Sequence, residues 1–308
     1  MKTQSNSNTR RSKLPVDGLL LLNKPAGLTS NRALQKVKRL LHASKAGHTG
    51  SLDPAATGML PLCFGEATKV CAYLLHADKT YRVSARLGEK TDTGDADGQV
   101  IACASVPQMT ELQWQSVIDQ FLGETQQIPP MYSALKINGK RLYELARKGQ
   151  VVERKPRTIR IDEITLLECK GSRLVLRVKC SKGTYIRTLV EDIAEAAGTI
   201  AYTDSLHRES VGAFRAEDML DLSKAEEWAK SAPELLRKRL LAPDIALAAM
   251  PSVEIRQDQA ARFVQGQQLE VADASNGEVR VYGEKGQFLG VGELIGNGRL
   301  APRRVFNI

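Results

Sequence analysis

Strands are predicted where apolar residues form a continuous run or alternate with polar residues. Four consecutive leucines at residues 19–22 are typical of a buried strand. Residues 81–87 alternate between apolar and polar side chains, and residues 174–180 repeat the pattern. Both segments are therefore expected to form strands with one buried face.

Other segments show the spacing of helices. Apolar residues three and four positions apart follow Ser30, which we take as the N-cap of a helix that reaches Leu41. Residues 111–122 also indicate a helix. A third helix is expected after Thr184 and ends at Gly198, a residue type that commonly terminates helices.

Strands and helices do not alternate regularly, so the pattern favours an α+β fold with a large mixed or antiparallel sheet over a doubly wound parallel sheet. Residues 1–15 are polar, basic and without periodicity, which predicts a disordered tail. Residues 16–248 form the main domain, whose helix-rich end is residues 223–248. Short strands and many glycines then predict a small β-rich second domain, residues 251–308.

The chain carries a formal net charge of +9 and has a pI near 9.3. Such a surplus favours a polyanionic partner, because Lys and Arg release counterions from phosphates, although a merely soluble basic protein would show the same charge. No apolar stretch approaches the roughly 18 residues that a membrane span requires. We therefore expect a soluble, cytoplasmic protein with no membrane partner.

The sequence contains no complete motif for a metal site, a disulfide scaffold or a cofactor site. The five cysteines include no Cys-x-x-Cys pair, which indicates reduced, buried thiols. Residues 92–98 resemble a calcium loop but place Ala104 where a bidentate glutamate is required, so we interpret them as a turn with Asp hydrogen bonds. Residues 290–292 begin a dinucleotide fingerprint that Ile295 breaks. The four histidines are dispersed, and we expect neither metal nor cofactor.

The most informative segment is residues 47–61, in which glycines and His48 precede Asp53 and Pro54. Asp followed by Pro is a good helix start, with Asp as the N-cap and Pro at the first helical position. Dense glycine, however, is costly unless the backbone must approach a ligand closely. Asp53 is therefore a helix cap, a catalytic carboxylate, or both.

Six blocks of the sequence resemble one family, in that family's order. They are Asn23 to Pro25 with Gly27 to Ser30, Gly47 to Gly58, Lys79 to Val83, Arg86 to Gly88 with Thr91 to Thr93, Pro129 to Lys136, and Lys182 to Arg187. The family is that of the bacterial tRNA pseudouridine-55 synthases, the TruB family. Nearly the whole chain resembles it, and the C-terminal domain is more loosely similar to the family's RNA-binding PUA module.

The resemblance implies an enzyme that isomerises uridine 55 in the T-loop of tRNA to pseudouridine. The glycosidic bond breaks, the base rotates, and a carbon–carbon bond forms at the same sugar carbon. It also implies that the protein is a monomer, needs no cofactor, and binds the tRNA T-stem-loop without a protein partner.

Asp53 matches the family's essential carboxylate, which attacks either the uracil ring or the ribose. Arg187 matches the arginine that pairs with it, and a guanidinium at this place is expected to lower the carboxylate pKa and keep it ionised. Without the resemblance, Arg187 is equally well read as a surface residue of an amphipathic helix.

Four further residues match substrate contacts of the family. Tyr81 corresponds to the aromatic that stacks on the flipped base and helps remove its C5 proton, and Tyr185 to a tyrosine that contacts the substrate. Leu206 corresponds to an apolar residue packed on the base, and His48 to the residue that fills the space the flipped base leaves. From the pattern alone, Tyr81 and Leu206 would be core residues and His48 a loop residue without a task.

Residues 136–157 carry eight Lys or Arg against two Glu. A run of charge is often only a solvated helix face. With the block before it, the run resembles the family's mobile thumb, about residues 127–157, which closes over the RNA hairpin. The cations expected to bind phosphates are Lys136, Lys140, Arg141, Arg147 and Lys148.

Two other classes of function remain open from the sequence. A non-catalytic RNA-binding or RNA-folding protein would use the same basic segment and C-terminal domain. A hydrolase of a nucleoside bond would need a second acid/base carboxylate beside Asp53, and the sequence does not identify one.

Overall fold

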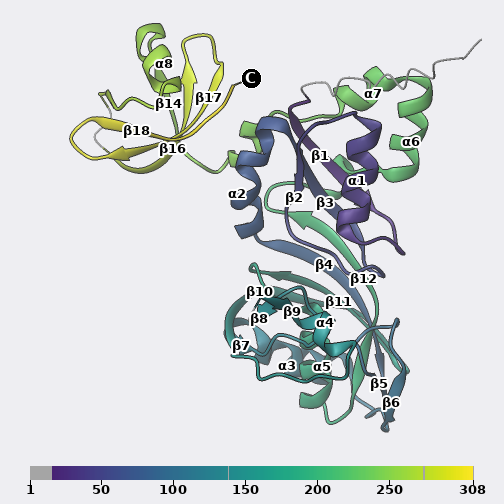
Figure 1. Ribbon diagram of the computed structural model, residues 1–308. Coiled ribbons are helices and arrows are strands. Elements are labelled where there is room, and N and C mark those ends of the chain that lie inside the picture. Colours follow the sequence, from purple (N-terminus) through teal and green to yellow (C-terminus); the bar gives the residue numbers. More distant parts are fainter. Residues whose placement is uncertain (1–15, 138, 273–274, 308) are drawn as a thin grey trace, which may run out of the picture.

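The computed structural model describes residues 16–137, 139–272 and 275–307. The predicted disordered tail, residues 1–15, lies outside these residues. The fold is α+β with a large sheet and a separate β-rich C-terminal domain, as the sequence predicts (Figure 1). No helix among the described residues is long and apolar enough to cross a membrane.

A nine-stranded sheet organises the N-terminal domain. Its strands, in spatial order, are β13 (Leu220–Asp221), β1 (Gly18–Lys24), β3 (Thr57–Phe64), β12 (Ala201–Val211), β4 (Lys79–Leu87), β11 (Arg173–Cys180), β10 (Arg157–Lys170) and β7 (Gly123–Gln127), with β2 (Ala46–His48) paired to β3. Two pairs, β1 with β13 and β3 with β12, are parallel, and the others are antiparallel. The sheet is therefore mixed, as predicted.

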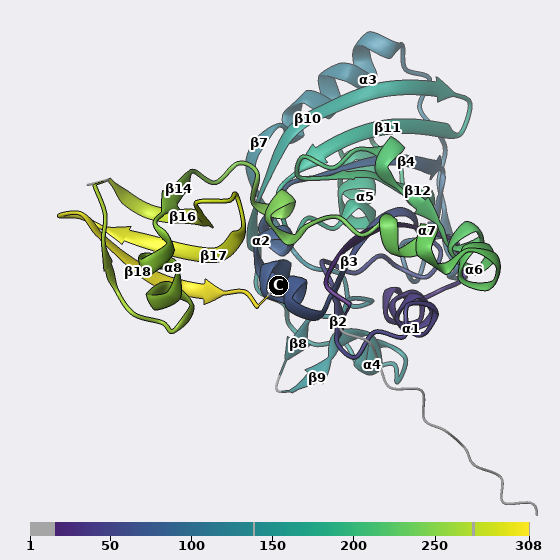
Figure 2. The same cartoon turned by 90° about the horizontal axis from the view of Figure 1, so that it is seen from above.

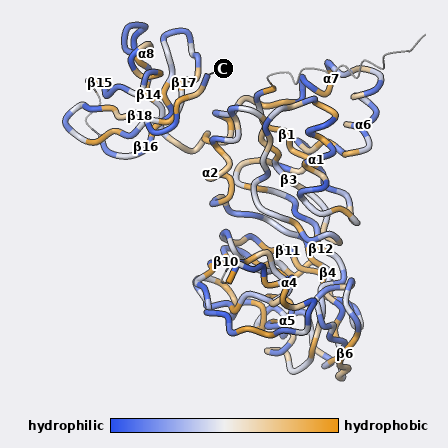
Figure 3. Tube along the Cα trace, in the orientation of Figure 1, coloured by the Kyte–Doolittle hydropathy of each residue, from blue (hydrophilic) through white to orange (hydrophobic). Residues whose placement is uncertain are grey.

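Helices cover this sheet in two regions. Strands β4, β10, β11 and β12 curve around α5 (Ile186–Ala196), and α3 (Glu111–Ile118) packs against β10 in the same apolar cluster (Figure 2). At the other end, α1 (Ser30–Leu40), α6 (Leu222–Ser231) and α7 (Pro233–Lys238) cover one face of β1 and β3. The opposite face of β1 and β3 packs against α2 (Cys71–His76). Hydrophobic stretches accordingly gather in the interior of the sheet region (Figure 3).

Short elements complete the domain. They are two hairpins, β5 (Glu89–Thr91) with β6 (Val100–Cys103) and β8 (Lys136–Ile137) with β9 (Lys140–Arg141), the helix α4 (Leu142–Ala146), and four 3₁₀ turns, Gly65–Val70, Asp119–Phe121, Ala216–Asp218 and Pro243–Leu247. All five cysteines are free thiols. The prediction that they are buried is confirmed for Cys63 and Cys180, whereas Cys71 and Cys169 are half-buried and Cys103, on the exposed strand β6, is exposed.

Two local predictions need correction. The N-cap of α1 is Thr29, whose hydroxyl accepts a hydrogen bond from the Arg32 amide, and not Ser30. In β4 the polar positions are not all solvent-facing: Arg82 is exposed, but Ser84 is buried. Thr80 and Ser84 are both buried, so the face of β4 opposite Tyr81 is also covered in part.

The C-terminal domain is a second, five-stranded sheet covered by α8 (Gln257–Val264). Its strands, in spatial order, are β14 (Ser252–Ile255), β16 (Asn276–Gly283), β17 (Phe288–Ile295), β18 (Arg299–Val305) and β15 (Leu269–Glu270). Phe288 and Phe306 belong to the same buried cluster as Leu19 and Met59 of the large sheet. The two domains therefore share apolar packing and are not joined by a linker alone.

Candidate active site

Asp53 lies in an irregular loop, residues 49–56, between β2 and β3, which we call the Asp53 loop. No helix follows it, so the interpretation of Asp53 as a helix cap is wrong. The chain instead enters β3 at Thr57. Since the carboxylate does not cap backbone N–H groups of a helix, it is available for chemistry.

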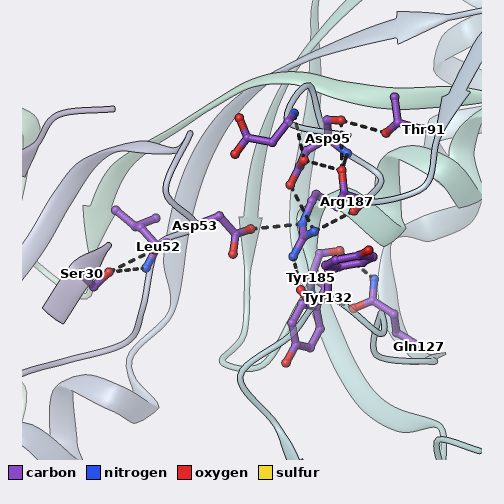
Figure 4. Close-up of polar contacts among 11 residues, drawn as sticks. Ser30, Leu52, Asp53, Thr91, Asp95, Gln127, Tyr132, Tyr185 and Arg187 are labelled. Atoms are coloured by element: carbon purple, nitrogen blue, oxygen red, sulfur yellow. Dashed lines mark hydrogen bonds and ion pairs between the residues drawn. The ribbon is translucent and has the colours of Figure 1, made fainter. Parts of the chain in front are cut away.

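Hydrogen bonds hold the loop on both sides of Asp53. The Ser30 hydroxyl accepts from the Leu52 amide at 2.8 Å and donates to the Leu52 carbonyl at 3.1 Å (Figure 4). The Pro54 carbonyl accepts from the Gly27 amide at 2.9 Å and from the ammonium of Lys24 at 3.2 Å. The residues on either side of Asp53 are thus fixed to the start of α1 and to the segment just before it.

Lys24 is fully buried, and its ammonium also donates to the carbonyls of Pro25 and Leu28, each at 2.8 Å. Burial lowers the pKa of Lys24 to about 8, although the Asp53 carboxylate acts in the opposite direction. Lys24 therefore mainly links three backbone carbonyls, those of Pro25, Leu28 and Pro54, next to Asp53.

Arg187, near the start of α5, meets Asp53 directly. Its Nε lies 3.1 Å from the Asp53 carboxylate (Figure 4). Only 6 % of the Arg187 side chain is exposed, so it is not the surface arginine of the alternative interpretation. The rest of the guanidinium donates to the Thr93 carbonyl at 2.7 Å and the Tyr132 carbonyl at 2.6 Å, and Nη1 lies 3.2 Å from Asp95. This network fixes the orientation in which the guanidinium faces Asp53.

Asp95 is the site residue that the sequence interpretation missed. It belongs to the segment that resembles a calcium loop, and that segment is a turn held by Asp side chains, as predicted. The Asp95 carboxylate accepts from the Thr93 hydroxyl at 2.6 Å and the Asp97 amide at 3.2 Å, while Asp92 accepts from the Gln99 amide at 2.8 Å. The turn thereby presents Asp95 to Arg187, and no local signal in the sequence specifies that contact.

The pKa of the Asp53 carboxyl is shifted in the direction opposite to the sequence expectation. Burial raises the pKa of the Asp53 carboxyl above 3.8, and the nearby carboxylate of Asp95 adds to this rise, while Arg187 lowers the pKa. The expectation of a net lowering is therefore wrong, although the guanidinium acts in the expected sense. Because 43 % of the Asp53 side chain remains exposed, solvent screening limits these effects.

Tyr81 and Leu206 lie on adjacent strands, β4 and β12. Leu206 pairs with Val83 in the register and packs on the cluster that contains Tyr81, Leu52 and Ala56. Tyr81 is buried, and this burial raises the pKa of its phenol. The two side chains therefore belong to the apolar surface beside the Asp53 loop.

Tyr185 directly precedes α5. Its amide donates to the Gln127 side chain at 2.8 Å, and its carbonyl accepts from the same side chain at 3.1 Å. Burial raises the pKa of the Tyr185 phenol, and both Asp53 and Arg187 contribute to its electrostatic environment. Gln127 ends β7, so the backbone beside Arg187 is tied to the strand from which the basic segment starts (Figure 4).

His48 ends β2 and precedes the Asp53 loop. Burial and the positive charge of Arg208 lower the pKa of its imidazole below 6.5. Its Nδ1 is buried, without a hydrogen-bond partner among the described residues. His48 is therefore mainly neutral at pH 7, and it keeps one unused polar atom beside the loop.

The basic segment leaves the sheet and returns to it at adjacent positions, because Arg157 of β10 pairs with Gln127 of β7. All five cations expected to bind phosphates are exposed: Lys136, Lys140, Arg141, Arg147 and Lys148. Lys136 and Arg141 are direct cross-strand partners, an arrangement in which like charges repel. Arg141 and Arg147 also lie 5.9 and 5.6 Å from the ring centre of Tyr143. The segment therefore presents a dense group of exposed cations, of which Arg141 also lies 3.8 Å from the Glu144 carboxylate.

The described residues contain no group of three or more His, Cys, Asp or Glu that could hold a metal ion. The chemistry that this site offers directly is that of one partly exposed carboxylate, a fixed guanidinium and a neighbouring phenol.

Comparison with known proteins identifies the class of this chain, the pseudouridine synthases. Residues 38–186 match the TruB family pseudouridylate synthase (N terminal domain), and residues 251–306 match the pseudouridine synthase II TruB C-terminal domain. The chain belongs to the TruB family of pseudouridylate synthases and is accordingly an isomerase.

Individual relatives agree with this assignment. The chain is 48 % identical to a tRNA pseudouridine synthase B of Chromohalobacter salexigens, with 97 % of each chain covered. It is 49 % identical to one of Aeromonas salmonicida, again with 97 % of each chain covered. Its fold is similar to a chain in the crystal structure of a Cbf5–Nop10–Gar1 complex, with a TM-score of 0.73, 27 % identity, and 94 % of this chain and 85 % of that chain covered.

Proposed function

We propose that this enzyme converts uridine 55 in the T-loop of tRNA to pseudouridine, with Asp53 as its essential carboxylate. The observation that carries the proposal is the pair formed by Asp53 and Arg187, in which a partly exposed carboxylate is aligned by a buried guanidinium. The names of the curated relatives support tRNA as the substrate. The protein acts as a monomer and without a cofactor.

The reaction is an isomerisation, so every atom of the substrate is conserved. The bond between ribose C1′ and uracil N1 breaks, the base rotates, and C1′ bonds to C5. The C5 proton leaves, and N1 gains a proton. Asp53 acts either as a nucleophile on the uracil ring or as a nucleophile on the ribose carbon, where it stabilises cationic character as in glycosidases. Both routes require an ionised, fixed carboxylate.

The target base must leave its stack before Asp53 can reach the sugar. In the proposed complex, the flipped uracil stacks on Tyr81, and Leu206 packs against it. Tyr185 contacts the same nucleotide. His48, which lies next to the Asp53 loop and is neutral, occupies the space that the base leaves in the RNA.

The exposed cations of the basic segment bind the RNA backbone. The repulsion between Lys136 and Arg141 is relieved when a phosphate lies between them. The segment functions as a thumb, about residues 127–157, that closes over the hairpin, and the C-terminal domain, residues 251–308, binds the tRNA as a PUA-like module.

Asp95 offers an argument against hydrolysis. A hydrolase of the nucleoside bond needs a second carboxyl group that is free to activate water. Asp95 is the nearest candidate, but only 13 % of its side chain is exposed and its oxygens are engaged by Arg187, Thr93 and Asp97. This arrangement favours rearrangement of the bound uridine over attack by water.

The test is Asp53→Asn on an unmodified tRNA transcript. Tritium release from C5-labelled uridine and mass-spectrometric mapping should show loss of pseudouridine at position 55, while filter binding shows near-normal affinity. Asp119→Asn, which makes the same change at an exposed carboxylate outside the proposed RNA-binding segments, should behave like the wild type. Turnover by Asp53→Asn would exclude the proposed role of Asp53, and modification of a different uridine by the wild type would exclude the proposed substrate position.

A further inference from the structure

Arg208 of β12 is a buried cation to which the proposed reaction assigns no role. Only 1 % of the residue is exposed, and no carboxylate among the described residues lies within 4.0 Å of its guanidinium. A buried charge without a counter-charge is costly and requires compensation by hydrogen bonds. The bonds that Arg208 makes therefore indicate why it is there.

Those bonds connect the start of the Asp53 loop to strand β3, which follows the loop. The Arg208 Nε donates to the Met59 carbonyl at 2.6 Å, and Nη2 donates to the Gly50 carbonyl at 3.2 Å. Gly50 comes before Asp53 and Met59 comes after it. One guanidinium thus closes the base of the loop and attaches it to the sheet.

The same side chain also lies beside Tyr81. Arg208 and Tyr81 are cross-strand partners in the register of β12 and β4, so their side chains share one face of the sheet. Burial raises the pKa of the Tyr81 phenol, and the positive charge of Arg208 acts in the opposite direction. The other charged or titratable groups that face the phenol are Cys180 of β11 and Asp53, and both raise its pKa.

We propose that Arg208 is a positioning residue of the isomerisation, which holds the Asp53 loop on the sheet and places its positive charge on the same face as Tyr81, the acceptor of the C5 proton. In that step the phenolate oxygen takes the proton, and the electron pair of the C5–H bond returns to the ring. The charge of Arg208 favours the ionised form of the Tyr81 phenol. This inference rests on the proposed function.

The experiment compares two ways of loosening the loop. Ser30→Ala removes two bonds to Leu52 and leaves Tyr81 untouched, whereas Arg208→Met removes the bonds to the loop and the charge beside the phenol. Single-turnover rates at saturating enzyme, measured from about pH 7 to 11.5 so that the range extends beyond the ordinary phenol pKa of 10, separate the two effects because only the second changes a proton acceptor.

We expect Arg208→Met to lower the rate at neutral pH by about 100-fold and to move the alkaline rise of the rate to higher pH. Ser30→Ala should lower the rate by the same factor at every pH. Arg208→Lys, which keeps a cation, should retain the wild-type position of the alkaline rise and recover part of the rate. If circular dichroism shows that Arg208→Met does not fold, Arg208→Lys takes its place in the double-mutant cycle.

A double-mutant cycle with Tyr81→Phe completes the test. In the Tyr81→Phe background, Arg208→Met should lower the rate by no more than Ser30→Ala does. The effects of Arg208→Met and Tyr81→Phe on the rate should therefore be strongly non-additive. Additive losses, or a pH profile of Arg208→Met that has the same shape as that of Ser30→Ala, would show that Arg208 is only structural. A wild-type enzyme that forms no pseudouridine would instead refute the proposed function itself.

Discussion

Arg187 lies between Asp53 and Asp95, with Nε 3.1 Å from one carboxylate and Nη1 3.2 Å from the other. The two contacts occupy different nitrogens, so Asp95 fixes the guanidinium without competing for the edge that Asp53 uses. The carboxylate proposed to react is therefore oriented through a residue that faces a second, more buried carboxylate.

The first prediction concerns that second carboxylate. Asp95→Asn should lower the single-turnover rate by about 10- to 100-fold, because Arg187 loses the charged partner that holds it, while tRNA affinity stays near the wild-type value. Rapid-quench kinetics and filter binding measure the two quantities. Asp92→Asn removes a carboxylate of the same turn that does not contact Arg187, and an equal loss in this control would mean that the turn, not the Asp95 contact, is responsible.

The second prediction concerns stability and pH. The pKa of Asp53 is higher in the folded protein than its ordinary value, so ionisation of Asp53 opposes folding. This cost is absent below the ordinary pKa of 3.8 and fully present above the raised one. Asp53→Asn should thus be at least as stable as the wild type at pH 7, and its advantage should shrink toward about pH 4. Urea unfolding at both pH values checks this, and a less stable variant at pH 7 would contradict it.

The third prediction concerns the thumb. The triple substitution of Lys136, Lys140 and Arg141 by alanine should weaken tRNA binding and reduce the slope of log affinity against log salt by about 0.7–0.9 for each lost phosphate contact. The single-turnover rate at saturating enzyme should change little. A matched triple of exposed cations on α6 and α7, Lys230, Arg237 and Lys238, provides the control. Equal salt slopes for the two triples would locate the RNA elsewhere.

The fourth prediction concerns Gly58, the second residue of β3. Its φ is +100°, and a Cβ there would lie 2.3 Å from the carbonyl oxygen of Arg208, which is backbone and cannot move aside. Gly58→Ala should therefore destabilise the fold by about 2–4 kcal/mol, as measured by urea unfolding. Gly183→Ala is the comparison, since its φ is +83° but nothing lies within 4 Å of the added carbon. A similar loss in both would mean that backbone conformation, not the clash, dominates.

The sequence predicts those parts of the fold whose determinants are local. The alternation in residues 174–180 and the helical spacing before Gly198 reproduce the observed β11 and α5, because periodic burial acts within one element. The same local reasoning fails at Asp53. Asp followed by Pro fits a helix start, but Ser30, Gly27 and Lys24 bond to the loop and hold it in an irregular conformation.

Long-range contacts explain what the sequence did not reveal about the site. Asp95 and Arg208 look like a turn residue and a strand residue, and their importance comes from partners far along the chain: Arg187 in one case, and Gly50 and Tyr81 in the other. The net rise in the pKa of Asp53 had the same origin, because burial depends on everything that surrounds the loop. The resemblance to a family supplied the Asp53–Arg187 pair but not the geometry around it.

The bond from Arg187 to the carbonyl of Tyr132 has a consequence for how the enzyme responds to its substrate. Tyr132 lies near the start of the segment proposed as the thumb, so any displacement of that segment would also move a hydrogen-bond partner of Arg187. Under the proposed function, RNA binding by this segment would therefore be coupled to the orientation of the Asp53 carboxylate.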